Sequence, residues 1–318
     1  MPSSYQGVDA STQRRTVGVT HQLDEVVTVE PVLRTVDRIV TKARLGPDGQ
    51  VDDKALIIGP HRPELTDPFL VLSEDWFSSP GFDWHPHRGV ETVTMVVDGA
   101  LEHGDSAGNA GVLTTGDVQW MTSGRGIIHR ELAFRDERAH TLQLWVNLPA
   151  HRKLTTPRYQ DLYASGRPVI DRKGVRIDVI SGEVDGVTGP AINQWPISGA
   201  VITLEPGQRC AHVLPGRDRA FLHVLAGSPA IAGRVVEAGQ TAWSDPVRDT
   251  LASSITVETA GRETTAVVMA FSGEPLREPV AVGGPFVMNT RAELTQAFRD
   301  FHSGAFGDIP RQARLKYR

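Results

Sequence analysis

The sequence predicts an all-β protein, and two features of its 318 residues carry that prediction. Short apolar runs of strand length recur along the chain, separated by turns rich in Gly, Pro and Asp. The chain also contains 31 Gly and 21 Pro residues, a density that favours many turns over long helices. No helical crossover pattern lies between neighbouring runs, so we expect them to form β-barrels or β-sandwiches.

The apolar runs fall into two sets, which predict two domains. The first set includes "ALIIG", "PFLVL", "ETVTMVV", "GVLTTGDVQWM" and "HTLQLWVNLP". The second includes "VRIDVIS", "AVITLEPGQ", "AFLHVLAG", "GRVVEAGQTAWS" and "ETTAVVMAFSG". Between them lies the polar segment "AHRKLTTPRYQDLYAS", which we expect to be a linker or a short helical bridge. We therefore assign residues 1–165 to a first domain with its linker and residues 166–318 to a second.

The two halves resemble each other weakly. "VVDGALE" in the first half is similar to "VLAGSPA" in the second, and "LTTGDVQWM" is similar to "VEAGQTAWS". In each half a strand ends in Gly, and a Gly-Asp or Gly-Gln turn later leads to a Trp. This repetition indicates two copies of one β-domain.

One helix is predicted near the C-terminus, over "NTRAELTQAFRDF". Thr290 and Glu293 have the spacing of a capping box. Leu294, Ala297 and Phe301 recur at helical spacing and form an apolar stripe. We expect this helix to pack onto a barrel.

The bulk composition restricts the classes of function. A net charge of −5 argues against a protein that binds nucleic acid through a broad basic surface. A single cysteine, Cys210, allows no intramolecular disulfide and fits a reducing compartment. The N-terminal segment has no signal-peptide pattern, and no apolar run approaches the ~20 residues that span a bilayer. We expect a cytoplasmic protein without nucleic-acid or membrane partners.

Two His-containing pairs predict a metal centre in the first domain. His85 and His87 in "WHPHRG" are two positions apart, so an extended chain points both imidazoles to one face. His129 and Glu131 in "IIHREL" repeat that spacing on a second expected strand. Three imidazoles and one carboxylate, with no thiolate, suit Fe(2+), Mn, Ni, Cu or Zn.

Glu91 competes with Glu131 for the acidic role. It lies four positions after His87, so uninterrupted strand parity would place it on the same face. It could be a ligand, could orient a histidine or could pair with Arg88. Gly89 allows an irregularity in this strand, and parity alone does not decide between the two glutamates.

The remaining histidines are not part of a comparable pair of motifs. We interpret seven of them as solvent-facing or structural: His21, His61, His103, His140, His151, His223 and His302. In the second domain Cys210 and His212 share the two-residue spacing, but no partner motif follows them. We therefore expect the second domain to be free of metal and Cys210 to be a packed side chain.

These motifs resemble the pirin family of the cupin superfamily. "HPHRGVETVT" and "GDVQWMTSGRGIIHREL" are similar to its signature, "LTDPFLVLSEDW" to the segment before it and "FSGEPLREPVAVGGPFVMNT" to a late segment. The resemblance extends from about Asp67 to Phe301. It implies a bicupin, with two stacked β-barrels and a C-terminal helix.

The resemblance also implies a ligand set and a cofactor. A mononuclear iron, Fe(2+), is expected in the N-terminal barrel only, held by His85, His87, His129 and Glu131. Another divalent transition metal would suit the same ligands. In the wider superfamily a glutamate after the first histidine pair often binds the metal, so Glu91 remains an alternative.

Two functions follow from the resemblance. The first is a quercetinase-like dioxygenase, which opens a flavonol or another small aromatic substrate with O₂, with Glu131 or Glu91 accepting a proton. The second is a redox-sensitive regulatory protein that binds a transcription factor or metabolic enzyme. A structural barrel with an adventitious metal is a third reading, disfavoured because inward polar groups are costly without an ion.

Overall fold

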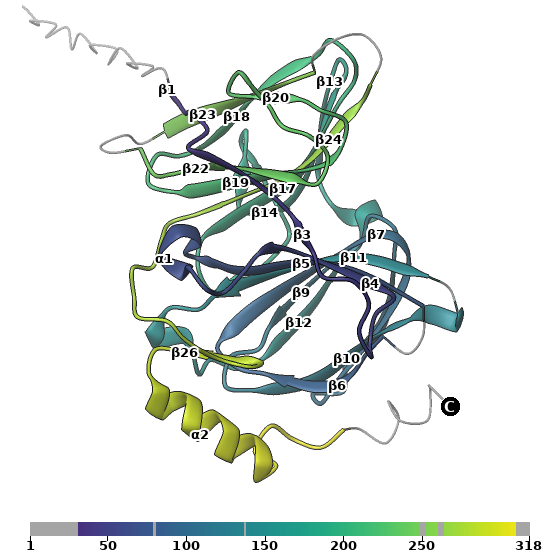
Figure 1. Cartoon of the computed structure of the whole chain (residues 1–318), viewed down its shortest axis with the longest axis vertical. Coiled ribbons are helices and arrows are strands. Elements are labelled where there is room, and N and C mark those ends of the chain that lie inside the picture. The colour runs from purple at the N-terminus through teal and green to yellow at the C-terminus, as the bar shows by residue number, and fades with distance from the viewer. Residues whose placement is uncertain (1–30, 79–80, 137, 248–251, 260–263, 310–318) are drawn as a thin grey trace, which may run out of the picture. The chain divides into compact units, whose positions relative to one another are not determined.

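The computed structural model describes residues 31–78, 81–136, 138–247, 252–259 and 264–309, and strands dominate throughout (Figure 1). The all-β prediction with two cupin barrels and a C-terminal helix is confirmed. The expectations for the first 30 residues, including His21, lie outside the described residues.

The first barrel is built on a ten-stranded sheet within the described ranges. The longest strand of this sheet is β7 (Val90–Asp105). It pairs with β8, β9, β10 and β11. The other strands are β3 (Ala43–Arg44), β4 (Asp53–Ile58), β5 (Phe69–Phe77), β6 (Phe82–His87), β8 (Ala110–Thr114), β9 (Val118–Thr122), β10 (Ile127–Ala133), β11 (Ala139–Asn147) and β12 (Arg158–Leu162).

The segment expected to be a linker contains a strand of this barrel. β12 pairs with β9 in antiparallel register, with Tyr159 opposite Met121. Short 3₁₀ helices η2 (Ala150–Arg152) and η3 (Ala164–Gly166) flank it. The prediction of a linker or a short helical bridge was therefore wrong over Arg158–Leu162, because strand pairing outweighs the polar, proline-bearing composition of this segment.

The second barrel consists of a seven-stranded and a five-stranded sheet in the described part of the chain. The larger sheet contains β13 (Val169–Arg172), β14 (Val175–Ser181), β17 (Ile197–Leu204), β24 (Ala266–Gly273), β19 (Arg219–Ala226), β22 (Gln240–Ser244) and β2 (Arg38–Thr41). The smaller contains β1 (Val32–Leu33), β18 (Arg209–Pro215), β20 (Ala230–Ile231), β21 (Arg234–Val235) and β23 (Ala252–Glu258).

Two hairpins, two α-helices and one further 3₁₀ helix complete the described elements. The hairpins are β15 (Glu183–Val184) with β16 (Val187–Thr188) and β25 (Ala281–Gly283) with β26 (Phe286–Met288). The helices are α1 (Pro63–Thr66), α2 (Arg291–His302) and η1 (Phe134–Asp136). Neither α-helix has the length and apolar character needed to cross a membrane.

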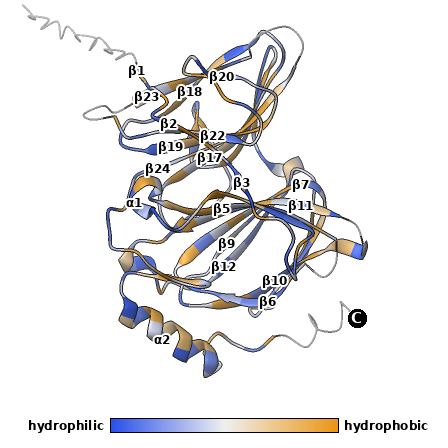
Figure 2. Cartoon of the chain, in the orientation of Figure 1, coloured by the Kyte–Doolittle hydropathy of each residue, from blue (hydrophilic) through white to orange (hydrophobic). Residues whose placement is uncertain are grey.

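The predicted C-terminal helix is confirmed as α2. The Thr290 side chain accepts a hydrogen bond from the Glu293 N–H, and the Glu293 side chain accepts one from Thr290, which completes the capping box. Hydrophilic and hydrophobic residues alternate along α2 in Figure 2. The apolar stripe of α2 packs on β26. Ala297 of α2 and Phe286 of β26 are both fully buried there.

Each end of the described chain packs against the barrel that is farther from it in the sequence. β1 and β2 precede the first barrel in sequence, yet they pair with β23 and β22 of the second. Conversely, β26 and α2 follow the second barrel but contact the first, where Phe286 bridges to Arg88. We retain the domain boundary after residue 165 as a proposal, because β12 and β13 on its two sides belong to different sheets.

The two barrel interiors differ in polarity. Alternate side chains of the second barrel form one aliphatic cluster that includes Val179, Ile202 and Leu222. Cys210 is buried in this cluster, and His212 has the same strand parity and is 4% exposed. In the first barrel, by contrast, His103, His129 and Glu131 are buried. Among the described residues, the clusters of potential metal ligands therefore lie in the first barrel.

An apolar core joins the barrels. Phe69 of the first barrel and Phe221 of the second meet edge to face, with ring centroids 4.9 Å apart. Trp120 and Trp243, the two tryptophans of the weak internal repeat, belong to the same cluster. Burial of these large side chains contributes about 25 cal/mol per Å² of apolar surface.

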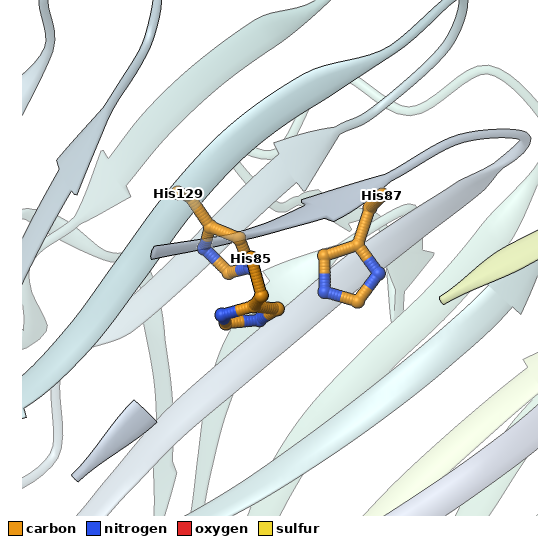
Figure 3. A group of neighbouring side chains, drawn as sticks. All are labelled: His85, His87 and His129. Atoms are coloured by element: carbon orange, nitrogen blue, oxygen red, sulfur yellow. The ribbon is translucent and has the colours of Figure 1, made fainter. Parts of the chain in front are cut away.

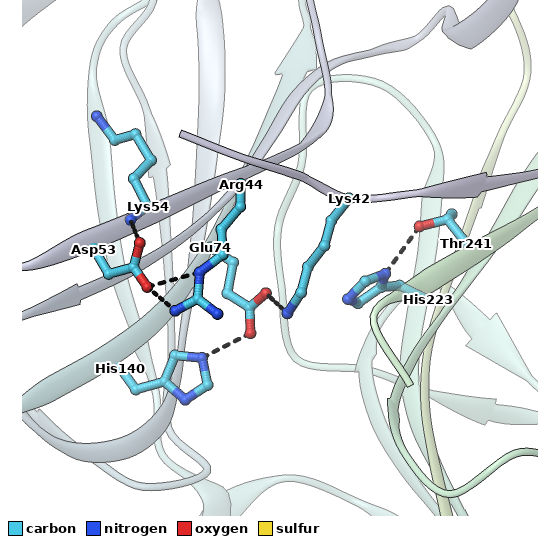
Figure 4. A network of polar contacts seen from close by, with 8 residues as sticks. All are labelled: Lys42, Arg44, Asp53, Lys54, Glu74, His140, His223 and Thr241. Carbon is cyan, nitrogen blue, oxygen red and sulfur yellow. Dashed lines mark hydrogen bonds and ion pairs between the residues drawn. The ribbon is translucent and has the colours of Figure 1, made fainter. Parts of the chain in front are cut away.

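A polar network lies beside this junction (Figure 4). His140 Nε2 lies 2.9 Å from Glu74 Oε1, and Lys42 forms an ion pair with the same carboxylate. His223 Nδ1 lies 2.8 Å from Thr241 Oγ1. His140 and His223 therefore have structural contacts, in keeping with the sequence-based interpretation.

Candidate metal centre

Strands β6 and β10 bring three histidines together. They pair in antiparallel register, which places His129 opposite His85 and Ile127 opposite His87. Because side chains alternate along a strand, the three imidazoles share the inner face of the barrel. Figure 3 shows the three rings gathered at one point. The ring centroids are 4.3 Å apart for His85 and His129, and 4.9 Å for His87 and His129.

This spacing suits a shared ion. The potential ligand atoms of His85, His87 and His129 all lie within 4.8 Å of one another. Ligands at a metal–nitrogen distance of about 2.1 Å are separated by at most about 4.2 Å, so small side-chain adjustments would close the site. His85 Nδ1 donates to the Asp83 carbonyl at 2.7 Å, which leaves Nε2 unprotonated.

Burial favours the neutral form of these imidazoles. Desolvation lowers the pKa of His87 and of His129 well below the ordinary value, and the neighbouring rings lower it further. The Pro285 carbonyl opposes this shift at His87, although no hydrogen bond of ordinary geometry joins them. Neutral imidazole is the form that binds a metal.

The buried nitrogens also lack other partners. Within the described residues, both ring nitrogens of His87 and both of His129 form no hydrogen bond. Buried polar atoms without partners are costly, and a bound cation would satisfy one nitrogen of each ring. The donor set therefore fits a divalent transition metal.

Glu131 lies on the same strand as His129, at the edge of this cluster. Thr94 Oγ1 donates to its Oε1 at 2.9 Å and Gln143 Nε2 to its Oε2 at 2.6 Å. The β6–β10 register shifts between His129 and Glu131, and Glu131 lies opposite Phe82. Glu131 instead forms a second, overlapping cluster with His103 and His129.

His103, which we interpreted from the sequence as solvent-facing or structural, lies beside this cluster. It is fully buried on β7, directly opposite Glu131 in the β7–β10 ladder. Its Nε2 lies 3.9 Å from Asp105 Oδ2, and its ring packs 4.7 Å from that of Tyr159. The signal was present in "LEHGD", where His103 and Asp105 repeat the two-residue spacing of the other pairs.

Glu91 lies in a different environment. Its Oε1 accepts a hydrogen bond from Thr122 Oγ1 at 2.6 Å, and Oε2 lies 3.3 Å from the Gln194 N–H. Val93, which shares its parity along β7, belongs to the apolar core between the barrels. Glu91 is in neither of the two clusters of potential ligands among the described residues. Burial raises its pKa to about 7.

Profiles of two protein families match the chain. The profile described as Pirin covers residues 58–146, and the Pirin C-terminal cupin domain covers residues 199–307. Pirin from Homo sapiens is 39% identical over 254 residues, which are 77% of this chain and 86% of that protein. The chain belongs to the pirin family.

Two solved structures share the fold of this pirin-family chain. Quercetin 2,3-dioxygenase from Acinetobacter baumannii is 31% identical, with a TM-score of 0.78, over 88% of this chain and 100% of that chain. Bacterial pirin YhhW from Escherichia coli, in complex with nickel(II), is 21% identical over 75% of this chain and 100% of that chain, with a TM-score of 0.60. At that identity the YhhW match supports the shared fold.

A pocket of about 400 Å³ reaches the histidine cluster of this pirin-family chain. Its polar lining includes His85, His87 and Glu131. Its walls are mainly apolar, and they include Leu56, Val71, Phe82 and Trp145. Such a pocket can bind a small aromatic molecule beside a metal.

Proposed function

We propose that this pirin-family protein is a metal-dependent dioxygenase of the quercetin 2,3-dioxygenase type. Its substrate would be a flavonol or a related small aromatic molecule, with O₂ as the second substrate. The observation that carries the proposal is the apolar pocket that opens onto His85, His87 and Glu131. The similarity to a quercetin 2,3-dioxygenase over most of the chain supports it.

The proposed ligands are His85, His87, His129 and Glu131. Three neutral imidazoles and one carboxylate would leave a divalent cation with partly compensated charge. We propose Fe(2+), which the family resemblance implies, although nitrogen and oxygen donors also accept other divalent transition metals. A bound transition metal supplies Lewis-acid and redox chemistry to the pocket.

Glu131 is the proposed proton acceptor. The hydrogen bonds from Thr94 and Gln143 hold its carboxylate at the pocket wall. A substrate hydroxyl beside it could transfer its proton to a carboxylate oxygen within hydrogen-bond reach. Glu91 is not among the pocket-lining residues, so we favour Glu131 for this role.

Loss of the visible absorbance of quercetin under air tests the activity. Iron-loaded wild type is expected to turn quercetin over, and His87→Ala to lose at least 100-fold in rate. His61→Ala, which removes an exposed histidine, is the matched control and should retain activity. No turnover by wild type, or equal turnover by H87A, would refute the proposal.

A redox-sensitive regulatory role is the second candidate, and one contact favours it. Arg88, next to His87, forms an ion pair with Asp300 on helix α2, so the cluster is connected to a surface element. Fe(2+) and Fe(3+) differ by one charge, and that difference acts strongly in a low-dielectric interior. Capture of a protein partner that depends on ferrous, ferric or apo state supports this role, whereas capture independent of metal state argues against it.

A further inference from the structure

The C-terminal segment, residues 286–306, contacts the turn that follows His87. Val287 N–H donates to the Arg88 carbonyl at 3.0 Å, and Phe286 forms an isolated bridge with Arg88. Gly89 has a φ of +80°, and a Cβ built there would lie 2.0 Å from the Val287 carbonyl oxygen. Only glycine therefore allows the two backbones to approach so closely.

The Arg88 side chain stabilises this contact through an ion pair, a hydrogen bond and a cation–π contact. Its Nη1 lies 2.7 Å from Asp300 Oδ2 of α2, and its Nε donates to the Arg125 carbonyl at 2.7 Å. The guanidinium carbon lies 4.6 Å from the ring centroid of Phe306. Arg88 is 7% exposed, whereas the Asp300 side chain is 28% exposed, so the arginine is the buried member of this ion pair.

The same segment contacts the start of β10, which carries His129. A Cβ at Gly126, where φ is +134°, would lie 2.6 Å from the Phe306 ring. Ser106 Oγ donates to the Phe306 carbonyl at 3.0 Å and accepts from the Ile128 N–H at 3.1 Å. Residues adjoining His129 and Asp105 are therefore tied to one C-terminal residue.

Lys153 also connects the turn after His87 to the C-terminal segment. Its buried Nζ donates to the carbonyl oxygens of Gly89 and Val287, at 2.9 and 3.0 Å. It also donates to Asn147 Oδ1 at 2.5 Å. One ammonium group thus joins the turn after His87, the end of β11 and strand β26.

We propose that residues 286–306 position the metal-site histidines, and that Arg88 and Asp300 are the positioning residues through which they act. This inference rests on the proposed metal centre and extends it to a helix on the barrel surface. His87 and His129 would keep their relative placement only while the C-terminal segment holds the backbone beside them. Partners that orient metal ligands typically change metal affinity by about 10–100-fold when removed.

Cobalt(II) binding to the full-length protein tests the inference. Asp300→Asn keeps the side-chain volume but removes the charge that faces Arg88. We expect D300N to bind cobalt(II) about tenfold more weakly than wild type and to show a shifted cobalt absorption band. Asp300→Glu, which retains the carboxylate, should restore binding to within about threefold of wild type.

A matched variant separates positioning from general stability. Arg172→Gln removes an Arg–Asp ion pair of the second barrel, 2.9 Å long, and should leave cobalt affinity and spectrum unchanged. If D300N binds cobalt(II) with the affinity and spectrum of wild type, the positioning role is refuted. In that case the metal centre stands, because the wild-type protein binds the metal. Absence of binding by wild type would refute the metal centre itself. Should D300N not fold, Phe306→Leu provides the same comparison, because it removes the ring beneath Arg88.

Discussion

His103 lies directly opposite Glu131 in the β7–β10 ladder, and its ring centroid is 5.3 Å from that of His129. The first barrel therefore presents a fourth imidazole, fully buried, beside the three that β6 and β10 supply. Asp105 Oδ2 lies 3.9 Å from His103 Nε2, a distance beyond that of a hydrogen bond.

Replacement of His103 should weaken metal binding without abolishing it. We expect His103→Phe to raise the dissociation constant of cobalt(II) about tenfold, because the group behind His129 and Glu131 is lost. His129→Ala should cost far more, since a direct ligand disappears. Metal titrations of both variants measure the difference, and His212→Asn, a buried histidine of the second barrel, is the control. An unaltered affinity in H103F would exclude a role for this residue at the centre.

Metal loading should stabilise the fold. A bound ion would give one ring nitrogen of His87 and one of His129 the partner that each lacks in the described structure. At a free metal concentration 100-fold above the dissociation constant, the free energy of unfolding should rise by about 2.7 kcal/mol. Thermal unfolding with and without metal measures this gain. A double variant lacking His85 and His87 should show none, and an equal gain in that variant would place the ion elsewhere.

Glu91 should make stability depend on pH. Burial raises its pKa from 4.5 to about 7, so between these values the folded state keeps a proton that the unfolded state releases. Stability contributed by this group is therefore complete below pH 4.5 and is lost as pH rises through about 7, by about 3 kcal/mol in total. Urea unfolding at pH 5 and pH 8 tests this.

Glu91→Gln is the matching variant for that titration. The neutral amide should remove this part of the pH dependence and make the protein more stable than wild type at pH 8. Glu205→Gln, on an exposed turn, should follow the wild-type profile. A pH profile of E91Q identical to wild type would contradict the assignment of the buried proton to Glu91.

The barrel junction should carry a large share of the stability. Phe221 is fully buried against Phe69, and Phe221→Ala should lower the free energy of unfolding by about 3–5 kcal/mol. Leu154→Ala, at a side chain that is 61% exposed, should change it by about 0.5 kcal/mol or less. Comparable effects of the two substitutions would mean that the apolar core does not hold the barrels together.

Local patterns predicted the elements that depend on neighbouring residues. The apolar runs became strands, the capping box of Thr290 and Glu293 formed, and the period-two spacing placed His85 and His87 on one face. The weak internal repeat also has a physical basis. Gly99 within β7 and Gly227 directly after β19 have φ of +85° and +77°, and at each a Cβ would press on a backbone carbonyl.

Features that depend on the pairing of strands far apart in the sequence could not be predicted from local sequence patterns. The parity argument for Glu91 failed to carry across residues 88–89, because β6 ends at His87 and Gly89 turns the chain before β7. The two-residue spacing of His103 and Asp105 marked this pair, but only the register of β7 with β10 placed His103 beside Glu131. The pairing of β1 and β2 with the second barrel spans about 200 residues and was likewise unpredictable.

Anomalous diffraction from crystals of the iron- or nickel-loaded protein tests the metal centre most directly. We predict one strong peak in the first barrel, within bonding distance of ring nitrogens of His85, His87 and His129 and of a Glu131 oxygen. A loaded protein whose peak lies away from these side chains, or which shows no peak in this barrel, would contradict the proposed centre and the activity assigned to it.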